Sequence, residues 1–237
     1  MGVIGDNLQA VRARIAAAAI AAGRDPASAG LLAVSKTFGA EAVMAARAAG
    51  QRAFGESYVQ EAVDKIATVA DPGIEWHFIG PLQSNKTRLV AEHFDWVHSV
   101  SSLRIARRLS EQRPASRGPM SICLQVNVSG EATKAGVSEA ELPALASEVA
   151  TLPGLRLRGL MCIPAPAEGF AAQRAPFAEL ARMQQRLLGA GMAVDTLSMG
   201  MSDDLEAAIA EGATWVRVGT AIFGSRTGAA SSAAAGA

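Results

Sequence analysis

Short runs of β-branched and aromatic residues alternate with longer stretches rich in Ala, Leu, Glu and Arg along most of the chain. The short runs are typical of buried strands, and the longer stretches are typical of helices. We expect eight strands, at residues 31–37, 52–57, 75–80, 96–101, 121–129, 155–164, 196–201 and 215–224. We expect helices between them, at residues 40–49, 58–69, 85–93, 102–112, 138–151, 173–189 and 203–211.

An additional helix is expected before the first strand. Its apolar residues Val3, Ile4, Leu8, Val11 and Ile15 fall on one helical face. The run 15–22 follows two arginines and superficially resembles an export signal, but it consists mostly of alanine. The amphipathic spacing favours a helix of a cytoplasmic protein over a signal peptide. No apolar run approaches the roughly 20 residues that a membrane-spanning helix needs.

Regular alternation of strands and helices predicts parallel βαβ units. Eight such units in a chain of 237 residues favour an α/β fold with a single (β/α)₈ TIM barrel plus the N-terminal helix. A doubly wound open sheet is the alternative, but no linker divides the chain at its midpoint. We therefore expect one barrel domain over residues 1–226 and a disordered low-complexity tail over residues 227–237.

Composition excludes several classes of protein. Twenty-two basic residues balance 22 acidic ones, so the chain has no electrostatic footprint for nucleic acid or an anionic membrane. The two cysteines, Cys123 and Cys162, are far apart in the sequence, which favours a reducing compartment over a disulfide framework. The three histidines lack the spacing of metal ligands. The motifs of metalloproteases, serine hydrolases, P-loop proteins and Rossmann dinucleotide-binding proteins are also missing.

Only four of the basic residues are lysines, so chemistry that needs an amine has few candidates. Lys36 follows the apolar run 31–34 and stands where the first strand reaches the barrel mouth. Desolvation there would lower its pKa and make it a nucleophile for an aldehyde. The alternative is a solvated lysine at the end of a strand. Lys65 and Lys86 are interpreted as surface charges of helices, and Lys134 either as a loop lysine or as a second amine over the mouth.

The ends of the last two strands carry small and hydroxylated residues. Ser198, Gly219 and Thr220 lie where many barrels bind phosphate, although tight turns would use the same residues. Arg217 alternates with Trp215 and Gly219, so it could point into the mouth. There it would need an acceptor, either a carboxylate in a structural salt bridge or a cofactor ring nitrogen. Glu56 and His98 are conceivable acid–base groups that nothing in the sequence pairs.

Six spaced motifs together resemble the pyridoxal phosphate homeostasis protein family. They are LAVSKT at 32–37, FGESYVQE at 54–61, WHFIGPLQSNK at 76–86, GLM at 159–161, LSMGMSD at 197–203 and VRVGTAIFG at 216–224. The resemblance implies a barrel like the N-terminal domain of alanine racemase that binds pyridoxal 5′-phosphate (PLP). It implies that Lys36 forms the Schiff base, that Ser198, Gly219 and Thr220 hold the phosphate, and that Arg217 faces the pyridine nitrogen. Lys134 matches a second family lysine linked to PLP transfer or secondary binding.

One position departs from the family. Ser57 replaces the asparagine that usually follows the Gly-Glu pair of the second strand. Serine is shorter and lacks the amide, so any cofactor or loop contact made by that asparagine is in doubt. The lysine, serine and arginine of the implied site are intact, and PLP binding is expected to survive.

The resulting hypothesis is a cytoplasmic, monomeric PLP-binding protein of intracellular PLP homeostasis and transfer, not an enzyme with robust catalysis. An arginine keeps its proton, so the ring nitrogen beside it stays unprotonated and withdraws electrons weakly. The only tyrosine, Tyr58, is not expected to oppose Lys36, and the length leaves no room for a second domain. Apo PLP-dependent enzymes are the expected partners, with no nucleic acid or membrane. The alternatives are a PLP-dependent amino-acid racemase-like enzyme and a phosphate-binding barrel enzyme without PLP.

Overall fold

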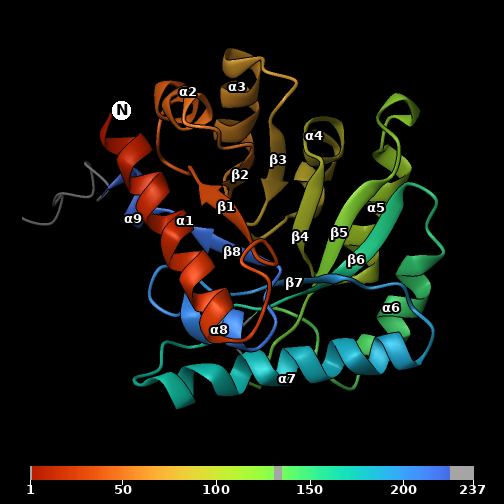
Figure 1. The fold of residues 1–237 in the computed structure, drawn as a ribbon. Coiled ribbons are helices and arrows are strands. Elements are labelled where there is room, and N and C mark those ends of the chain that lie inside the picture. The colour runs from red at the N-terminus through yellow and green to blue at the C-terminus, as the bar shows by residue number, and fades with distance from the viewer. Residues whose placement is uncertain (1, 131–134, 225–237) are drawn as a thin grey trace, which may run out of the picture.

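The computed structural model of the protein describes residues 2–130 and 135–224. Within them, eight parallel strands close into a barrel in which each strand pairs with its neighbour in the sequence and β8 pairs with β1 (Figure 1). The predicted (β/α)₈ fold is confirmed. The strands are β1 (Gly30–Val34), β2 (Ala53–Glu56), β3 (Glu75–Phe78), β4 (Trp96–Val100), β5 (Met120–Gln125), β6 (Leu155–Met161), β7 (Thr196–Ser198) and β8 (Trp215–Val218).

Helices surround the barrel and connect successive strands, as Figure 1 shows. They include α1, which precedes β1 and is the predicted additional helix. The α-helices are α1 (Val3–Ala21), α2 (Ala40–Ala48), α3 (Val59–Val69), α4 (Thr87–His93), α5 (Leu103–Gln112), α6 (Leu142–Ala150), α7 (Phe170–Gly189), α8 (Leu205–Ala210) and α9 (Thr220–Phe223). Two short 3₁₀ helices, η1 (Ser84–Lys86) and η2 (Ala115–Arg117), precede α4 and β5.

The ends of several elements differ from the prediction. The eighth strand was expected to continue to residue 224, but β8 ends at Val218 and the short helix α9 follows Gly219. The apolar run of residues 220–223 therefore belongs to a helix that turns away from the barrel. A capping box precedes α6, because Ser138 and Glu141 each accept a hydrogen bond from the other's backbone N–H. The helix itself begins one turn later, at Leu142.

The amphipathic face of α1 is buried as predicted, through Leu8, Val11, Ile15 and Ala19, whereas Val3 is exposed. The helix lies beside α8 and α9 (Figure 1) and packs against both. The Asn7 side-chain amide donates to the Ile222 carbonyl at 2.9 Å. The N-terminal helix is thus joined to the segments that follow the last two strands.

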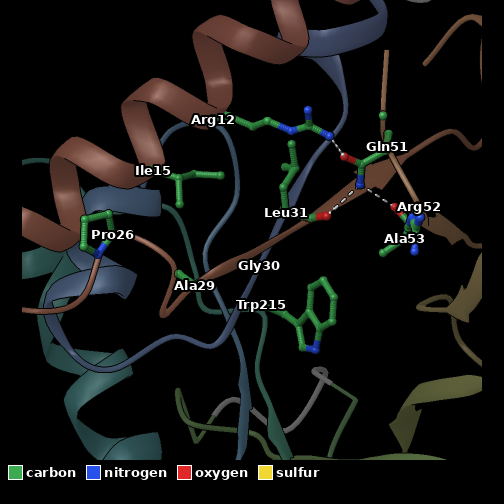
Figure 2. Close-up of a pocket in the computed structure, with 11 residues that line it drawn as sticks. Arg12, Ile15, Pro26, Ala29, Gly30, Leu31, Gln51, Arg52, Ala53 and Trp215 are labelled. Atoms are coloured by element: carbon green, nitrogen blue, oxygen red, sulfur yellow. Dashed lines mark hydrogen bonds between the residues drawn. The ribbon is translucent and has the colours of Figure 1, made fainter. Parts of the chain in front are cut away.

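A cavity of about 370 Å³ lies at the amino ends of β1, β2 and β8, below α1 (Figure 2). Arg12 donates to the Ala49 carbonyl and to Gln51 Oε1, and the Gln51 amide donates to the Leu31 and Ala53 carbonyls. These polar groups satisfy one another's hydrogen bonds. The bonds of Arg12 and Gln51 therefore join α1 to the barrel. No helix in the described part of the chain could cross a bilayer.

Candidate functional site

A second cavity, of about 360 Å³, lies at the carboxyl ends of the strands. Lys36, Arg217, Gly219 and Thr220 all line it. Loops after β1, β2, β3, β6, β7 and β8 contribute the rest of its wall, which includes Ser57, Ser202 and Asp203. The closed barrel therefore places the amine expected from β1 in the same cavity as the arginine and hydroxyl expected from β8. This is the end of a (β/α)₈ barrel at which active sites are built.

The segment that carries Lys36 is fixed on both sides by buried polar groups. Lys65 Nζ donates to the Ser35 carbonyl at 2.9 Å, and Ser35 Oγ donates to Glu56 Oε1 at 2.7 Å. On the other side, the Thr37 N–H donates to Glu61 Oε1 at 2.7 Å. Thr37 has a φ of +70°, a left-handed conformation that is unfavourable for a β-branched residue. Backbone strain of this kind persists only where the surroundings enforce it.

Lys65 contradicts its interpretation as a surface charge. The side chain is 4% exposed and its ammonium lies 2.6 Å from Glu56 Oε1 and 3.0 Å from Glu61 Oε1. Burial raises the pKa of the Glu56 carboxyl, although Lys65 and Ser35 oppose that rise. Val59 and Ala62 share the buried face of α3 with Lys65. That spacing of three residues was a signal in the sequence that Lys65 points inward.

Arg217 points into the barrel mouth, as the alternation in β8 predicted. Its side chain is nearly buried, and it donates to Ser198 Oγ at 2.8 Å and to the Cys162 carbonyl at 2.9 Å. Both acceptors are neutral, so the alternative of a structural salt bridge is not realised within the described residues. Burial lowers the pKa of the guanidinium, but an arginine remains charged in proteins. Two of its five N–H groups are used, which leaves donors for a ligand in the cavity.

Ser198 lies beneath the cavity and not in its wall. Its hydroxyl is buried between Arg217 and the His98 ring, with His98 Nδ1 2.7 Å from Oγ. The hydroxyl that β7 and its loop offer to the cavity is Ser202. The expected phosphate contact of Ser198 therefore stays a prediction, and Ser202 is a candidate for that role that the sequence reasoning missed.

The loop that carries Ser202 is held by α1. Arg14 Nη1 donates to the Ser202 carbonyl at 2.8 Å, and the same guanidinium forms an ion pair with Glu206 of α8. Within the loop, the Met201 N–H donates to Asp204 Oδ1 at 2.6 Å. These contacts give the loop after β7 a defined conformation at the cavity wall.

Gly200 and Gly219, which follow β7 and β8, lie close to neighbouring atoms. Gly200 has a φ of +91°, and a Cβ there would lie 2.5 Å from the Ala208 side chain. A Cβ on Gly219 would lie 3.0 Å from the Val34 carbonyl. At both positions, the missing side chain lets the backbone approach its neighbours closely.

The other described residues named in the sequence analysis lie outside the cavity, apart from Ser57. Lys134 and the tail at 227–237 lie outside the described residues. The Tyr58 side chain is exposed and does not line the cavity, whereas Ser57 does. Cys123 and Cys162 are buried thiols without a disulfide, and burial raises the pKa of Cys162 to about 12. No cluster of metal-ligating side chains occurs among residues 2–130 and 135–224.

Fold and site together define a barrel of the alanine racemase type. The family model described as "Alanine racemase, N-terminal domain" matches residues 7–227. The alanine racemase of Corynebacterium glutamicum shares this fold with a TM-score of 0.69 at 16% identity, over 96% of this chain and 61% of that one. PipY of Synechococcus elongatus, solved with PLP bound, is more similar, with a TM-score of 0.83 at 40% identity over 93% of this chain and 100% of that one.

Curated relatives narrow this class further. A Pseudomonas aeruginosa protein named "Pyridoxal phosphate homeostasis protein" is 63% identical over 226 residues, covering 95% of this chain and 97% of the relative. An Escherichia coli protein of the same name is 56% identical over 234 residues, covering 95% of this chain and 98% of the relative. The chain belongs to the pyridoxal phosphate homeostasis protein family. The resemblance inferred from the six motifs is confirmed.

Proposed function

We propose that this protein binds PLP in the cavity at the carboxyl ends of the strands, through a Schiff base with Lys36, and takes part in intracellular PLP homeostasis and transfer. The observation that carries the proposal is the meeting of Lys36, Arg217 and Thr220 in one cavity of about 360 Å³. The relatives' names and the PLP bound to PipY support it. When bound, PLP supplies an aldehyde and an electron-withdrawing ring.

The residues of the cavity fit such a ligand. A primary amine is the group that condenses with an aldehyde. A guanidinium and hydroxyls are the donors that suit a ring nitrogen and a phosphate. The volume lies within the range of small-molecule sites. Lys36, Arg217, Gly219 and Thr220 are assigned to PLP, with Ser202 in the wall and Ser198 behind Arg217. Lys134 is retained as a proposed helper in transfer or secondary binding.

The arrangement favours holding PLP over robust catalysis. Arg217 keeps its proton, so it donates to the ring nitrogen and leaves that atom unprotonated, which weakens the ring as an electron sink. A racemase with such an arginine needs two acid–base groups on opposite sides of the reacting carbon. Among the described residues that line the cavity there is Lys36 but no tyrosine, histidine or cysteine. Asp203 is the carboxylate in that wall.

Spectroscopy tests the proposal. The protein incubated with PLP is expected to show the visible absorption band of a lysine-bound PLP, which borohydride reduces irreversibly. Lys36→Ala should lack both the band and the borohydride-trapped adduct, because Lys36 supplies the amine. Lys86→Ala is the control, since Lys86 lies at the start of α4 and does not line the cavity. An unchanged band in Lys36→Ala would refute the assignment.

The alternative of a racemase-like enzyme is separated by a second measurement. The loaded protein is incubated with single L-amino acids in deuterated water, and exchange at Cα is followed by NMR. We expect no exchange at enzyme-like rates. Steady racemisation would instead favour the racemase-like enzyme, and absence of any PLP band in the unmodified protein would leave a phosphate-binding barrel without PLP. Transfer is measured as activity regained by an apo PLP-dependent enzyme mixed with the loaded protein.

A further inference from the structure

A continuous row of polar side chains crosses the interior of the barrel beneath the cavity. Glu75 Oε1 lies 2.7 Å from His77 Nε2, and His77 Nδ1 lies 2.9 Å from His98 Nε2. His98 Nδ1 lies 2.7 Å from Ser198 Oγ, to which Arg217 donates at 2.8 Å. We call Glu75, His77, His98, Ser198 and Arg217 the axial chain. It uses both histidine rings and the serine, none of which lines the cavity.

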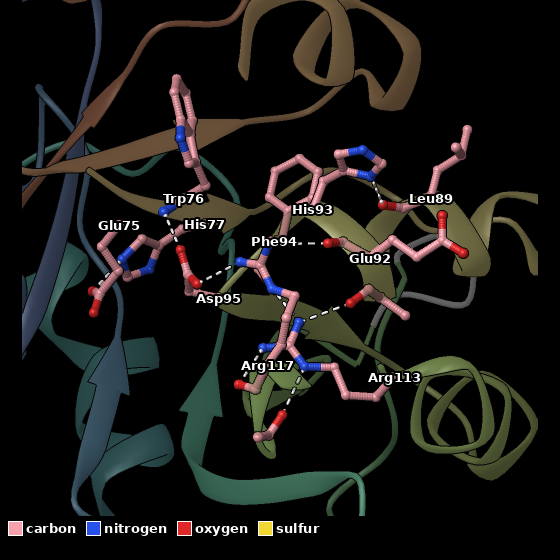
Figure 3. Close-up of polar contacts among 12 residues, drawn as sticks. Glu75, Trp76, His77, Leu89, Glu92, His93, Phe94, Asp95, Arg113 and Arg117 are labelled. Atoms are coloured by element: carbon pink, nitrogen blue, oxygen red, sulfur yellow. Dashed lines mark hydrogen bonds and ion pairs between the residues drawn. The ribbon is translucent and has the colours of Figure 1, made fainter. Parts of the chain in front are cut away.

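The axial chain connects the two ends of the barrel. Glu75 begins β3 at the amino end, and its side chain is 44% exposed. Figure 3 shows the Glu75 carboxylate against the His77 ring, while the neighbouring Asp95 contacts Trp76 and Arg117 instead. From His77 the row passes to His98 on β4 and then across the barrel to Ser198 on β7. It ends at Arg217, which lines the cavity.

The charges at the two ends fix the direction of the hydrogen bonds that Arg217 and Glu75 make. Arg217 can only donate, so Ser198 Oγ accepts from it. The hydrogen bond from His77 holds the pKa of Glu75 below its ordinary value, so Glu75 is a carboxylate that accepts from His77 Nε2–H.

Burial lowers the pKa of His98 strongly, which makes that ring neutral. A proton on His77 Nε2 alone leaves Nδ1 as an acceptor. His98 Nε2–H then donates to it, and the Ser198 hydroxyl donates to His98 Nδ1. Each proton then has one acceptor.

Aromatic rings enclose the middle of the axial chain. The Trp96 ring stacks on His77 with centroids 5.5 Å apart, and the Trp215 ring meets His77 edge-on at 5.1 Å. His77, His98 and Ser198 are fully buried. Because water does not reach these groups, a hydrogen bond lost here is not replaced by one to solvent. A buried donor left without an acceptor then lowers the free energy of unfolding.

We propose that Glu75 is a positioning residue for Arg217, acting from the opposite end of the barrel through His77, His98 and Ser198. Without the carboxylate, His77 loses the acceptor that keeps its proton on Nε2. Both rings can then adopt the other tautomer, in which His98 Nδ1–H donates to Ser198 Oγ. That hydroxyl would accept two hydrogen bonds while its own proton has no acceptor, and its bond to Arg217 is weakened. The link to PLP rests on the proposed function, whereas the order of protons within the axial chain does not.

The first measurement uses the protein without PLP. Imidazole ¹⁵N NMR is expected to show His77 and His98 with a proton on Nε2 and none on Nδ1. Glu75→Leu should move His98 to the other tautomer or to a mixture. Glu75→Gln should retain the original tautomer, because its amide oxygen can still accept from His77. An Nδ1–H tautomer in the unmodified protein, or a His98 spectrum unaffected by Glu75→Leu, would overturn the proposal.

The second measurement titrates PLP into the same variants. Glu75→Leu should bind PLP about fivefold to tenfold more weakly, as expected from one perturbed hydrogen bond. It should also shift the absorption maximum, because Arg217 is the residue proposed to face the ring nitrogen. Glu75→Gln should restore both values. Asp95→Asn is the matched control, since Asp95 lies at the same end of the barrel with a similar exposure but outside the axial chain.

The outcomes separate the two proposals. Equal loss of affinity in Asp95→Asn and Glu75→Leu, without a spectral shift, would mean that Glu75 serves stability alone and would refute the positioning role. A changed His98 tautomer with unchanged PLP affinity and spectrum would refute it as well. If the unmodified protein shows the expected tautomers but no PLP band, the proposed function fails while the proton order of the axial chain stands.

Discussion

At the scale of single residues, the site depends on charged groups that are removed from solvent. Lys65 and Glu56 form an ion pair with almost no exposure, and Ser35, next to Lys36, bonds to both of them. Glu56 Oε2 is buried without a hydrogen-bond partner among the described residues. A pair of this kind contributes little net stability over apolar residues, but it is costly to break. Its evident structural effect is to fix the backbone that presents Lys36.

Removing one member of this pair gives a prediction with a definite pH dependence. Lys65→Met should lower the free energy of unfolding by about 3–5 kcal/mol near neutral pH, because Glu56 keeps a buried charge without its partner. The folded pKa of Glu56, already raised, rises further. The folded state then holds this proton more tightly than the unfolded chain, so stability falls as pH rises from the ordinary pKa of glutamate through the folded value. Urea unfolding at about pH 5 and about pH 8 measures the difference.

Two variants control this experiment. Lys65→Met combined with Glu56→Gln should recover part of the loss at about pH 8 and remove its pH dependence, because no buried carboxylate remains. Lys86→Met, at a half-buried lysine outside this network, should unfold like the unmodified protein. A loss in Lys65→Met that is equal at both pH values would contradict the account.

At the scale of elements, α1 is more than a cover for the barrel. Asn7 is bonded to α9, Arg14 to the loop that carries Ser202, and Arg24 to the Ile209 and Ala213 carbonyls at the end of α8. These segments follow β7 and β8, the strands whose loops form the proposed phosphate side of the cavity. The additional helix therefore fixes the loops on that side.

Substitution of Arg14 tests this role. Arg14→Ala should weaken PLP binding about twofold to fivefold, since the Ser202 carbonyl loses one hydrogen bond and the loop gains freedom. The free energy of unfolding should change by only about 0–1 kcal/mol, because the ion pair with Glu206 is partly exposed. Arg186→Ala, which removes an exposed ion pair with Glu139 on another face, should leave PLP affinity unaltered. The readouts are a PLP titration and urea unfolding.

Sequence reasoning predicted the elements well and their ends less well. Hydrophobic runs continue past the barrel into loops and α9, and an apolar run alone does not show where pairing stops. Gly219 marks that point at β8, because the chain turns there into α9. The burial of Lys65 was missed because residue type was given more weight than residue spacing. A lysine is ordinarily exposed, and only the spacing from Val59 and Ala62 indicated otherwise.

At the scale of the whole molecule, closure of the barrel creates contacts that no local pattern contains. The six motifs and the positions of strand ends were enough to bring Lys36, Arg217, Gly219 and Thr220 into one site. The bond between His98 and Ser198 joins residues 100 positions apart and requires strands on opposite sides of a closed barrel. For that reason His98 was visible as a polar residue but could not be paired with Ser198 from the sequence. Glu56 was left unpaired for a different reason, because its nearby partner Lys65 was interpreted as a surface charge.

The closed barrel also predicts how PLP affects global stability. The cavity is assembled from loops at both ends of the sequence, so the unfolded chain has no binding site. PLP at about one hundred times its dissociation constant should therefore stabilise the protein by about 2.7 kcal/mol. For a domain of this size, the melting temperature should rise by about 5–10 °C. Differential scanning calorimetry measures the rise.

The same calorimetric experiment distinguishes the groups that bind PLP. Lys36→Ala should show a much smaller rise at the same PLP concentration, because the proposed covalent link is missing while the proposed contacts of Arg217 and Thr220 remain. Pyridoxal without its phosphate should also stabilise the unmodified protein less than PLP does, since the donors around Gly219 and Thr220 then have no anion to bind. Equal rises for PLP and pyridoxal would show that the end of the cavity formed by β7 and β8 does not recognise phosphate. Equal rises for Lys36→Ala and the unmodified protein would place the ligand away from the amine that β1 presents.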